Sequence, residues 1–207
     1  MKRPLATLLA GSVLTLAGAL AQSNPSKEWP TYGHDSGGMR FSPLTEITPG
    51  NVDRLKVAWV YHMKPEGAAV GDMPEGAPVG RGRGRGGSGF SPSENTPLVI
   101  NGTMYMSTPY SRLVALEPTT GKEIWAFHLP SSSPSTRGIE YWPGDAGTPP
   151  QIVFGSIDGK LYSLDAKTGK PNDAFGDNGI ANMNTPEIMG GLPGRNGLSS
   201  PDRKSVV

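Results

Sequence analysis

The feature that most constrains the fold is a ten-residue stretch that occurs twice, 48 positions apart. Residues 113–122 read LVALEPTTGK, and residues 161–170 read LYSLDAKTGK. The apolar residues upstream keep the same offset, because 104–106 align with 152–154. A repeat of this period is typical of solenoids, propellers and other arrays of one structural unit. Apolar strands flank a turn in each copy, so the repeated unit is predicted to be β rather than helical.

The composition supports an all-β chain with many turns. Of the 207 residues, 29 are Gly and 21 are Pro, which together make about a quarter of the chain. No cysteine is present, so no disulfide framework can hold the fold together. The formal net charge of +1 gives no indication of a nucleic-acid partner.

Residues 1–21 are predicted to be a signal peptide. Lys2 and Arg3 are followed by an apolar run over 5–20, and 19–21 form an A-x-A cleavage site. Export to the periplasm is therefore expected. The apolar run is short for a membrane span. A retained anchor helix is the alternative, and it would leave the protein associated with the membrane.

Residues 22–63 are expected to form an irregular lead-in that ends in a first propeller strand over 57–61. Within it, Thr48 as N-cap and Pro49 at the first helical position predict a short turn or helix. Residues 64–93 form a polar break around the low-complexity run GRGRGRGGSG. This break is either a solvated loop or a basic contact for an acidic partner, such as an electron acceptor.

Regular strands are predicted from residue 98 onward. The apolar runs 98–100 and 103–106 are joined by Asn-Gly, the strongest short hairpin signal, because a type I′ turn needs positive φ at both positions. Further strands are expected over 112–116 and 123–127. Four antiparallel strands in about 30 residues are typical of one propeller blade. The second copy predicts strands near 151–155 and 160–164, which begin another blade.

The fold class predicted is therefore all-β, a β-propeller of four-stranded antiparallel blades, with residues 94–207 forming its first blades. Propellers close with about four to eight blades. We expect this chain to be an incomplete propeller, the N-terminal portion of a longer one. An open propeller exposes sheet edges, so the chain alone is expected to be marginally stable.

The first copy of the repeat carries the spacing A-x-[DE]-x-x-T-G-x-x-x-W. Gly121 supplies positive φ for the turn, and Glu117 is placed to accept hydrogen bonds from the turn amides. Trp125 is predicted to stack against a neighbouring blade. The second copy departs from this pattern, because Ser163 replaces an alanine and Asp173 stands where the spacing places tryptophan. Its contact with a neighbouring blade is expected to be weaker.

This pattern resembles the tryptophan-docking motif of the quinoprotein dehydrogenases, which are eight-bladed propellers that bind pyrroloquinoline quinone (PQQ). Residues 29–35, 40–44, 47–59, 95–98 and 137–142 resemble further signatures of that family. Methanol-type members carry a vicinal disulfide, whereas this chain has no cysteine. The chain is more similar to the glucose dehydrogenase branch and its soluble periplasmic relatives.

The resemblance implies a periplasmic oxidoreductase that oxidises a glucose-like aldose or an alcohol with PQQ. Electrons would pass to ubiquinone or cytochrome c. In the family, Ca²⁺ acts as a Lewis acid on the quinone while a carboxylate takes the hydroxyl proton. The resemblance places that catalytic aspartate and the Ca²⁺ ligands beyond Val207, so the chain alone is expected to be inactive. His34, His62 and His128 show no metal-ligand spacing.

The resemblance also implies cofactor-binding roles for residues of this chain. Glu94 is expected to hydrogen-bond PQQ, Arg137 to pair with one of its carboxylates, and Ser199 to bind another. The alternatives are a solvent-exposed carboxylate for Glu94 and a surface ion pair for Arg137. Tyr110 is either a substrate-side residue or a packed turn aromatic.

A non-catalytic periplasmic β-propeller, acting as a scaffold or binding protein, is the competing interpretation. Such a protein would keep the docking repeat without the cofactor. Glu94 and the Arg137–Gly138 pair discriminate between the two, because a scaffold has no reason to place them.

Overall fold

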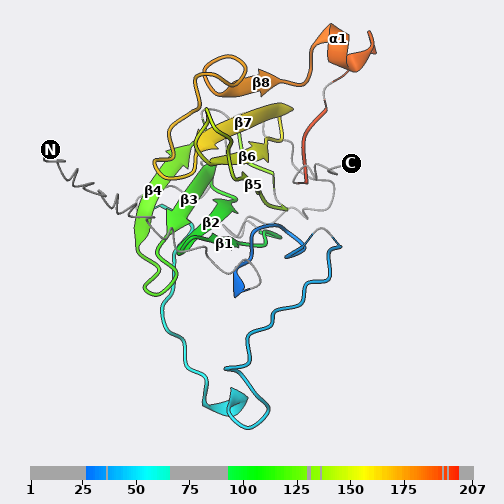
Figure 1. Cartoon of the computed structure of the whole chain (residues 1–207). Coiled ribbons are helices and arrows are strands. Elements are labelled where there is room, and N and C mark those ends of the chain that lie inside the picture. Colours follow the sequence, from blue (N-terminus) through cyan, green and yellow to red (C-terminus); the bar gives the residue numbers. More distant parts are fainter. Residues whose placement is uncertain are drawn as a thin grey trace, which may run out of the picture.

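The computed structural model contains two four-stranded antiparallel sheets (Figure 1). It describes residues 27–35, 37–65, 93–129, 132–135, 137–192, 194 and 196–200. The predicted signal peptide and the Arg-Gly run lie outside the described residues. The first sheet contains β1 (Leu98–Ile100), β2 (Thr103–Thr108), β3 (Arg112–Leu116) and β4 (Glu123–His128). The second contains β5 (Glu140–Trp142), β6 (Gln151–Gly155), β7 (Lys160–Asp165) and β8 (Ile180–Asn182).

Each sheet keeps its strands in sequence order, β1-β2-β3-β4 and β5-β6-β7-β8. This meander of four strands confirms the predicted fold class of four-stranded antiparallel blades. Two short helices complete the described elements, η2 (Val52–Arg54) and α1 (Pro186–Met189).

The β1–β2 hairpin forms through the local chemistry that the sequence predicts. Asn101 and Gly102 have φ of 50° and 73°, and Ile100 pairs directly with Thr103 across the turn. Positive φ at both central residues is the requirement of a type I′ turn. The hairpin register is therefore set by two turn residues.

The segment predicted as a first propeller strand, 57–61, is extended but belongs to neither sheet of the described structure. Trp59, Tyr61 and Met63 pack against the first sheet, whereas Val57 and Val60 are 81% and 68% exposed. The segment lies on the face of the sheet, so its backbone is not beside a strand edge and forms no ladder. In Figure 1 this cyan segment returns to the first sheet after residues 37–55 have looped away from it.

The capping prediction at Thr48 is wrong. Helix η2 begins after Asn51, whose side-chain Oδ1 accepts a hydrogen bond from the Thr48 amide at 2.7 Å. Asn51 and Thr48 thus form a local turn in which Thr48 donates through its backbone, so its hydroxyl caps no helix.

In each sheet, side chains at three equivalent positions pack against the segment that precedes the sheet in the chain. Met106, Val114 and Leu116 of the first sheet pack with Trp59 and Tyr61. Their counterparts 48 residues later are Phe154, Tyr162 and Leu164, which pack with β4. There the Phe127 ring lies 6.5 Å from Phe154 and 6.1 Å from Tyr162, in edge-on contacts. The sequence repeat is thus a repeat of docking surfaces.

Trp125 docks on the Thr-Gly turn of the second sheet, which confirms the predicted inter-blade contact. Its indole Nε1 donates to the Ala166 carbonyl oxygen at 3.1 Å. A Cβ on Gly169 would lie 2.6 Å from Trp125 Cδ2, so only glycine leaves room for the ring. Gly169 also has φ of 70°, which satisfies the turn.

Trp59 repeats this contact one blade earlier, which sequence reasoning missed. Its Nε1 donates to the Pro118 carbonyl oxygen at 2.9 Å, and a Cβ on Gly121 would overlap its ring. Pro118 and Gly121 correspond to Ala166 and Gly169 at the offset of the repeat. The segment around Trp59 therefore sits on the first sheet as β4 sits on the second.

The acidic residue of each turn accepts hydrogen bonds, but from different donors. Glu117 accepts from the hydroxyls of Thr119 at 2.8 Å and Thr120 at 2.5 Å, rather than from the predicted amides. Asp165 in the second turn accepts from both the amide and the hydroxyl of Thr168. The shorter aspartate reaches the backbone, whereas the longer glutamate extends to the side chains.

The spacing-based position of Asp173 is not the structural counterpart of Trp125. Ala115 pairs with Trp125 in the first sheet, whereas Ser163 donates its amide to Gly179 in the second at 2.9 Å. Asp173 lies exposed in the longer connection that leads to β8. A glycine therefore occupies the position of the docking tryptophan in the second sheet.

Candidate functional site

The alternating strand directions sort the connecting segments into two ends of the molecule. One end, the site end, contains residues 93–97, 109–111, 129, 132–135, 137–139, 156–159, 183–192, 194 and 196–200. The opposite end, the docking end, contains the β1–β2 turn, the two Thr-Gly turns and residues 143–150. Glu94, Tyr110, Arg137 and Ser199 all belong to the site end.

The structure brings Glu94 and Arg137 together, although 43 positions separate them in the sequence. Arg137 Nε lies 3.5 Å from Glu94 Oε2, and the two side chains are 58% and 68% exposed. An ion pair this exposed contributes about 0–1 kcal/mol to stability. Stability alone therefore gives little reason for the pair, and both groups are free to turn toward a ligand.

A buried polar network holds the backbone beneath this pair. Ser107 Oγ donates to the Ser135 carbonyl oxygen at 3.2 Å, and Ser135 Oγ donates to the Gly138 carbonyl oxygen at 2.9 Å. Both serines are buried. The network ties the end of β2 to the segment that carries Arg137, and so fixes where its side chain begins.

Asn95 contacts both the end of β2 and the segment that carries Arg137. Its Nδ2 donates to the Ser107 carbonyl oxygen at 3.1 Å. Its Oδ1 is buried and has no hydrogen-bond partner in the part of the chain that the structure describes. Gly138 has φ of 126°, and a Cβ there would lie 3.1 Å from this Oδ1. Gly138 is therefore both conformationally required and closely packed against Asn95.

Tyr110 and Ser199 lie at the site end without joining Glu94 and Arg137. The Tyr110 amide donates to Thr108 Oγ1 at 3.3 Å, as expected for a residue of the β2–β3 turn. Ser199 is exposed and follows Leu198, whose amide donates to the Ser156 carbonyl oxygen at 2.9 Å. The β6–β7 hairpin therefore lies between Ser199 and the segment of Arg137.

Asp158 anchors that hairpin. Its Oδ1 accepts from the hydroxyls of Ser132 and Ser156, both at 2.5 Å, and its Oδ2 lies 3.0 Å from Lys160 Nζ. Burial by itself raises the pKa of Asp158, but the two hydroxyls and the Lys160 ammonium outweigh it and lower the pKa. Asp158 thus stays charged and organises the site end from below.

Sequence reasoning missed Asn95, Ser107, Ser135 and Asp158 as parts of the site end. The serine-rich run around 131–135 was the only signal that hydroxyls gather there. No group of three or more His, Asp or Glu able to hold a metal occurs among the described residues. In the same residues, no helix has the length and apolar character needed to cross a membrane.

The arrangement can bind an anionic, hydrogen-bonding molecule. An exposed guanidinium offers two parallel donors to a carboxylate, and a nearby carboxylate accepts from the same molecule. The fold thus defines consecutive blades of a β-propeller, with an exposed ion pair at one end.

The chain belongs to the PQQ family of glucose/ethanol/alcohol dehydrogenase β-propeller domains, whose model matches residues 29–202. This confirms the resemblance drawn from the motifs. The glycerol dehydrogenase large subunit of Gluconobacter oxydans (strain 621H) is 32% identical, over 78% of this chain and 21% of the relative. The dehydrogenase subunit of the quinone alcohol dehydrogenase of the same organism is 34% identical, over 69% of this chain and 16% of the relative.

Other similar proteins lead to the same family. The quinoprotein glucose dehydrogenase of Escherichia coli (strain K12) is 29% identical, over 90% of this chain and 26% of the relative. The crystal structure of quinohemoprotein alcohol dehydrogenase from Comamonas testosteroni matches with a TM-score of 0.52 and 28% identity. That match covers 72% of this chain and 19% of the other. The chain thus spans about a quarter or less of the length of these relatives.

Proposed function

We propose that this chain supplies one wall of the PQQ site of a dehydrogenase that oxidises the CH–OH group of a sugar or an alcohol. The observation that carries the proposal is the meeting of Glu94 and Arg137 at 3.5 Å above a buried polar network. The similar proteins are glucose, alcohol and glycerol dehydrogenases, which supports this substrate class.

The residues at the site end fit PQQ, which is a flat tricarboxylate. Arg137 is exposed and can make a bidentate contact with one carboxylate. Glu94 is exposed as well and can accept a hydrogen bond from the cofactor. When bound, PQQ supplies the two-electron acceptor for oxidation of the substrate carbon.

Within this chain, the residues are assigned to binding and orientation. Arg137 holds the cofactor carboxylate, and Glu94 restrains the orientation of the guanidinium. The hydrogen bonds of Ser107 and Ser135 fix the backbone segment that carries Arg137. Ser199 and Tyr110 are assigned more peripheral contacts at the same end. The catalytic base and the Ca²⁺ ligands are proposed to come from polypeptide outside the described residues.

The proposal also includes location and electron transfer. We propose a periplasmic protein, on the basis of the predicted signal peptide. Its electrons would pass to ubiquinone or a cytochrome. Spheroplast fractionation of the tagged chain tests the location, and retention in the cytoplasmic fraction would contradict it.

Titration of PQQ into the dehydrogenase that contains this chain, followed by calorimetry, tests the binding role, because the chain supplies only one wall of the proposed site. Arg137→Ala should weaken binding about tenfold or more, because it removes a charge-assisted carboxylate contact. Arg54→Ala is the control, since Arg54 lies on η2 and its Nη2 donates to the Gly50 carbonyl oxygen. An absence of PQQ binding, or equal losses in the two variants, would defeat the proposal and favour a non-catalytic propeller.

A further inference from the structure

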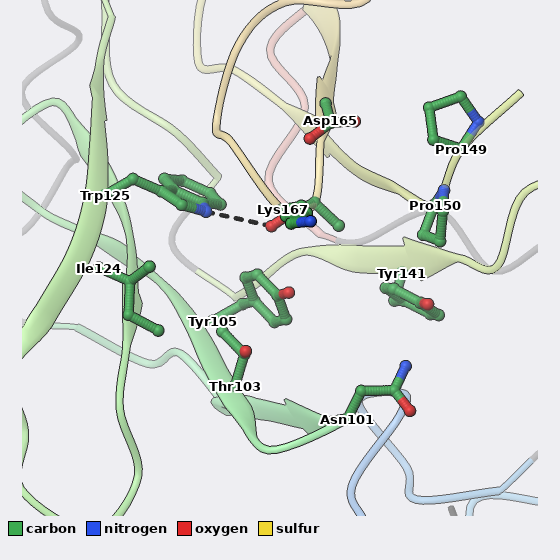
Figure 2. Close-up of a pocket in the computed structure, with 11 residues that line it drawn as sticks. Asn101, Thr103, Tyr105, Ile124, Trp125, Tyr141, Pro149, Pro150, Asp165 and Lys167 are labelled. Carbon is green, nitrogen blue, oxygen red and sulfur yellow. Dashed lines mark hydrogen bonds between the residues drawn. The ribbon is translucent and has the colours of Figure 1, made fainter. Parts of the chain in front are cut away.

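The docking end contains a pocket that the PQQ proposal does not use. It has a volume of about 380 Å³ and lies where β4 meets the turn of the second sheet (Figure 2). This places it at the opposite end of the strands from Glu94 and Arg137. Small-molecule sites in proteins begin at about this volume and combine apolar walls with a few convergent polar groups.

The walls of the pocket are aromatic and held in place. The Tyr105 and Trp125 rings lie 5.9 Å apart at 45°, and Tyr141 lines the pocket from β5. The indole of Trp125 is fixed by its hydrogen bond to the Ala166 carbonyl oxygen. Burial raises the pKa of both tyrosines, so their hydroxyls stay neutral donors and acceptors. The pocket therefore has an aromatic lining in which Tyr105 is almost fully buried and the position of Trp125 is fixed.

Polar groups from both sheets and their turns lie around the pocket. Figure 2 shows the Asn101 amide, the Tyr105 and Tyr141 hydroxyls and the Lys167 amine around the same space. Asn101 comes from the type I′ turn of the first sheet, and Lys167 from the docked turn of the second. Asp165 lines the pocket beside Lys167, so the two side chains bring opposite charges. Among the lining residues these two charges balance, and the Glu28 carboxylate lies beside the lining, where its Oε1 accepts from the Asn101 backbone amide at 2.9 Å.

We propose that this pocket binds a neutral saccharide of one or two rings. A pyranose ring has an apolar face that stacks on aromatic side chains, and its edge carries hydroxyls that both donate and accept. The balanced charges of Asp165 and Lys167 favour a neutral ligand over a charged one. The site is independent of PQQ, because no residue is shared between the two ends.

The test uses saturation-transfer NMR on the chain with glucose, maltose and cellobiose. Asn101→Gly removes the amide while keeping the turn, because glycine adopts the φ of 50° that Asn101 has. Lys167→Ala removes the amine. Each variant should weaken binding of the best of the three saccharides about fivefold, as expected for loss of one hydrogen bond at a ligand.

Matched controls are available in the same chain. Asn178→Gly replaces another asparagine at positive φ, 51°, and Lys170→Ala removes an exposed lysine of the same turn that does not line the pocket. Both should bind saccharide as the unaltered chain does. A saturating amount of PQQ should also leave the saccharide signal unchanged.

Three results would overturn the proposal. These are no saturation transfer to any of the three saccharides, equal losses in the pocket variants and the controls, and displacement of the saccharide by PQQ. The last result would move the saccharide to the site end while leaving PQQ binding intact. A failure of PQQ binding with retained saccharide binding would instead affect only the dehydrogenase proposal.

Discussion

The two tryptophan junctions differ in what stands behind the docking ring. Trp59 and Trp125 each donate an indole hydrogen bond to a carbonyl oxygen of a Thr-Gly turn. Trp59 lies against Gly121 of the first turn, and Trp125 lies against Gly169 of the second. Trp125 belongs to a four-stranded sheet, whereas Trp59 lies on an extended segment outside both described sheets. The difference teaches that a ring, a glycine and one hydrogen bond fix the docking position without help from a ladder.

The surroundings of the two junctions also differ in polarity. Beside Trp59, the Tyr61 hydroxyl donates to Glu123 Oε2 at 2.7 Å, and Arg112 Nη2 bonds to the same oxygen at 2.5 Å. Beside Trp125, the corresponding position is filled by Phe127, within edge-on reach of two aromatic rings. The first junction is therefore held by the polar contacts of Tyr61, Arg112 and Glu123, called here the polar clasp, and the second by aromatic packing.

The largest expected effect separates the two tryptophans. Trp125→Ala should lower the free energy of unfolding by about 4 kcal/mol, because the second junction loses its ring, its hydrogen bond and the packing over Gly169. Trp59→Ala should cost about half as much, since Trp125 also packs against the Tyr105 ring at 5.9 Å and no such ring contact supports Trp59 in the described structure. Urea unfolding of both variants measures the difference. Equal losses would show that the Tyr105 contact adds nothing to the second junction.

A glycine substitution should have the next largest effect. Gly169→Ala puts a Cβ 2.6 Å from Trp125 and forces positive φ on alanine, so we expect a loss of about 3 kcal/mol. Gly102→Ala is the control, because its φ is also positive but a Cβ there meets nothing within 4 Å. It should lose only about 1–2 kcal/mol. Similar losses for both would mean that the ring contact is unimportant.

The polar clasp predicts a smaller effect at the first junction. Arg112 is 7% exposed, and Glu123 is the acidic group within 4 Å of it among the described residues. Glu123→Gln should cost about 2 kcal/mol, because it leaves a buried guanidinium without its counter-charge. Glu187→Gln on α1 serves as the control. Thermal unfolding of each variant decides the comparison, and an unchanged midpoint for Glu123→Gln would contradict the clasp.

The smallest effect is a dependence on alkaline pH. Burial, and then the hydrogen bond to Glu123, raise the pKa of Tyr61 to about 12. Burial, and then the charge of Asp158, do the same for Tyr162. Because each folded pKa lies above the unfolded value, this stability is complete below about pH 10 and is lost as the pH rises through about 12.

In Tyr61→Phe, the free energy of unfolding should therefore fall less steeply with rising pH. The remaining fall should be the contribution of Tyr162. Urea unfolding at several values between pH 9 and about pH 12 measures the slope. A slope identical to that of the unaltered chain would show that Tyr61 ionises as freely in the folded state as in the unfolded one.

Local chemistry made much of the fold predictable. The Asn101–Gly102 turn and the apolar runs around it depend on neighbours in sequence, so β1 to β4 were predicted within a few residues. Asp173 was aligned with tryptophan because spacing cannot reveal a longer connection before β8. Trp59 was not recognised as a docking residue because its partner turn lies 59 positions away.

The site was predicted in a different way. The family resemblance assigned Glu94 and Arg137 to one cofactor but did not predict that the two side chains meet, since no spacing rule connects residues 43 positions apart. The supporting contacts of Asn95, Ser107 and Ser135 were not predicted, because a buried hydroxyl finds its partner only after the sheets pack. Ser199 was matched to a motif, but the β6–β7 hairpin lies between it and the segment of Arg137.

The tryptophan-on-glycine contact has a direction. One partner contributes a ring and the other contributes a turn, so the contact is heterologous and cannot pair two identical surfaces by a two-fold axis. Repeating such a step with a constant rotation gives either a closed ring or an endless spiral. In the second sheet, Gly179 takes the place of the ring. A blade added next to it would therefore have to be joined by some other contact, which makes this the point where the symmetry of the series is broken.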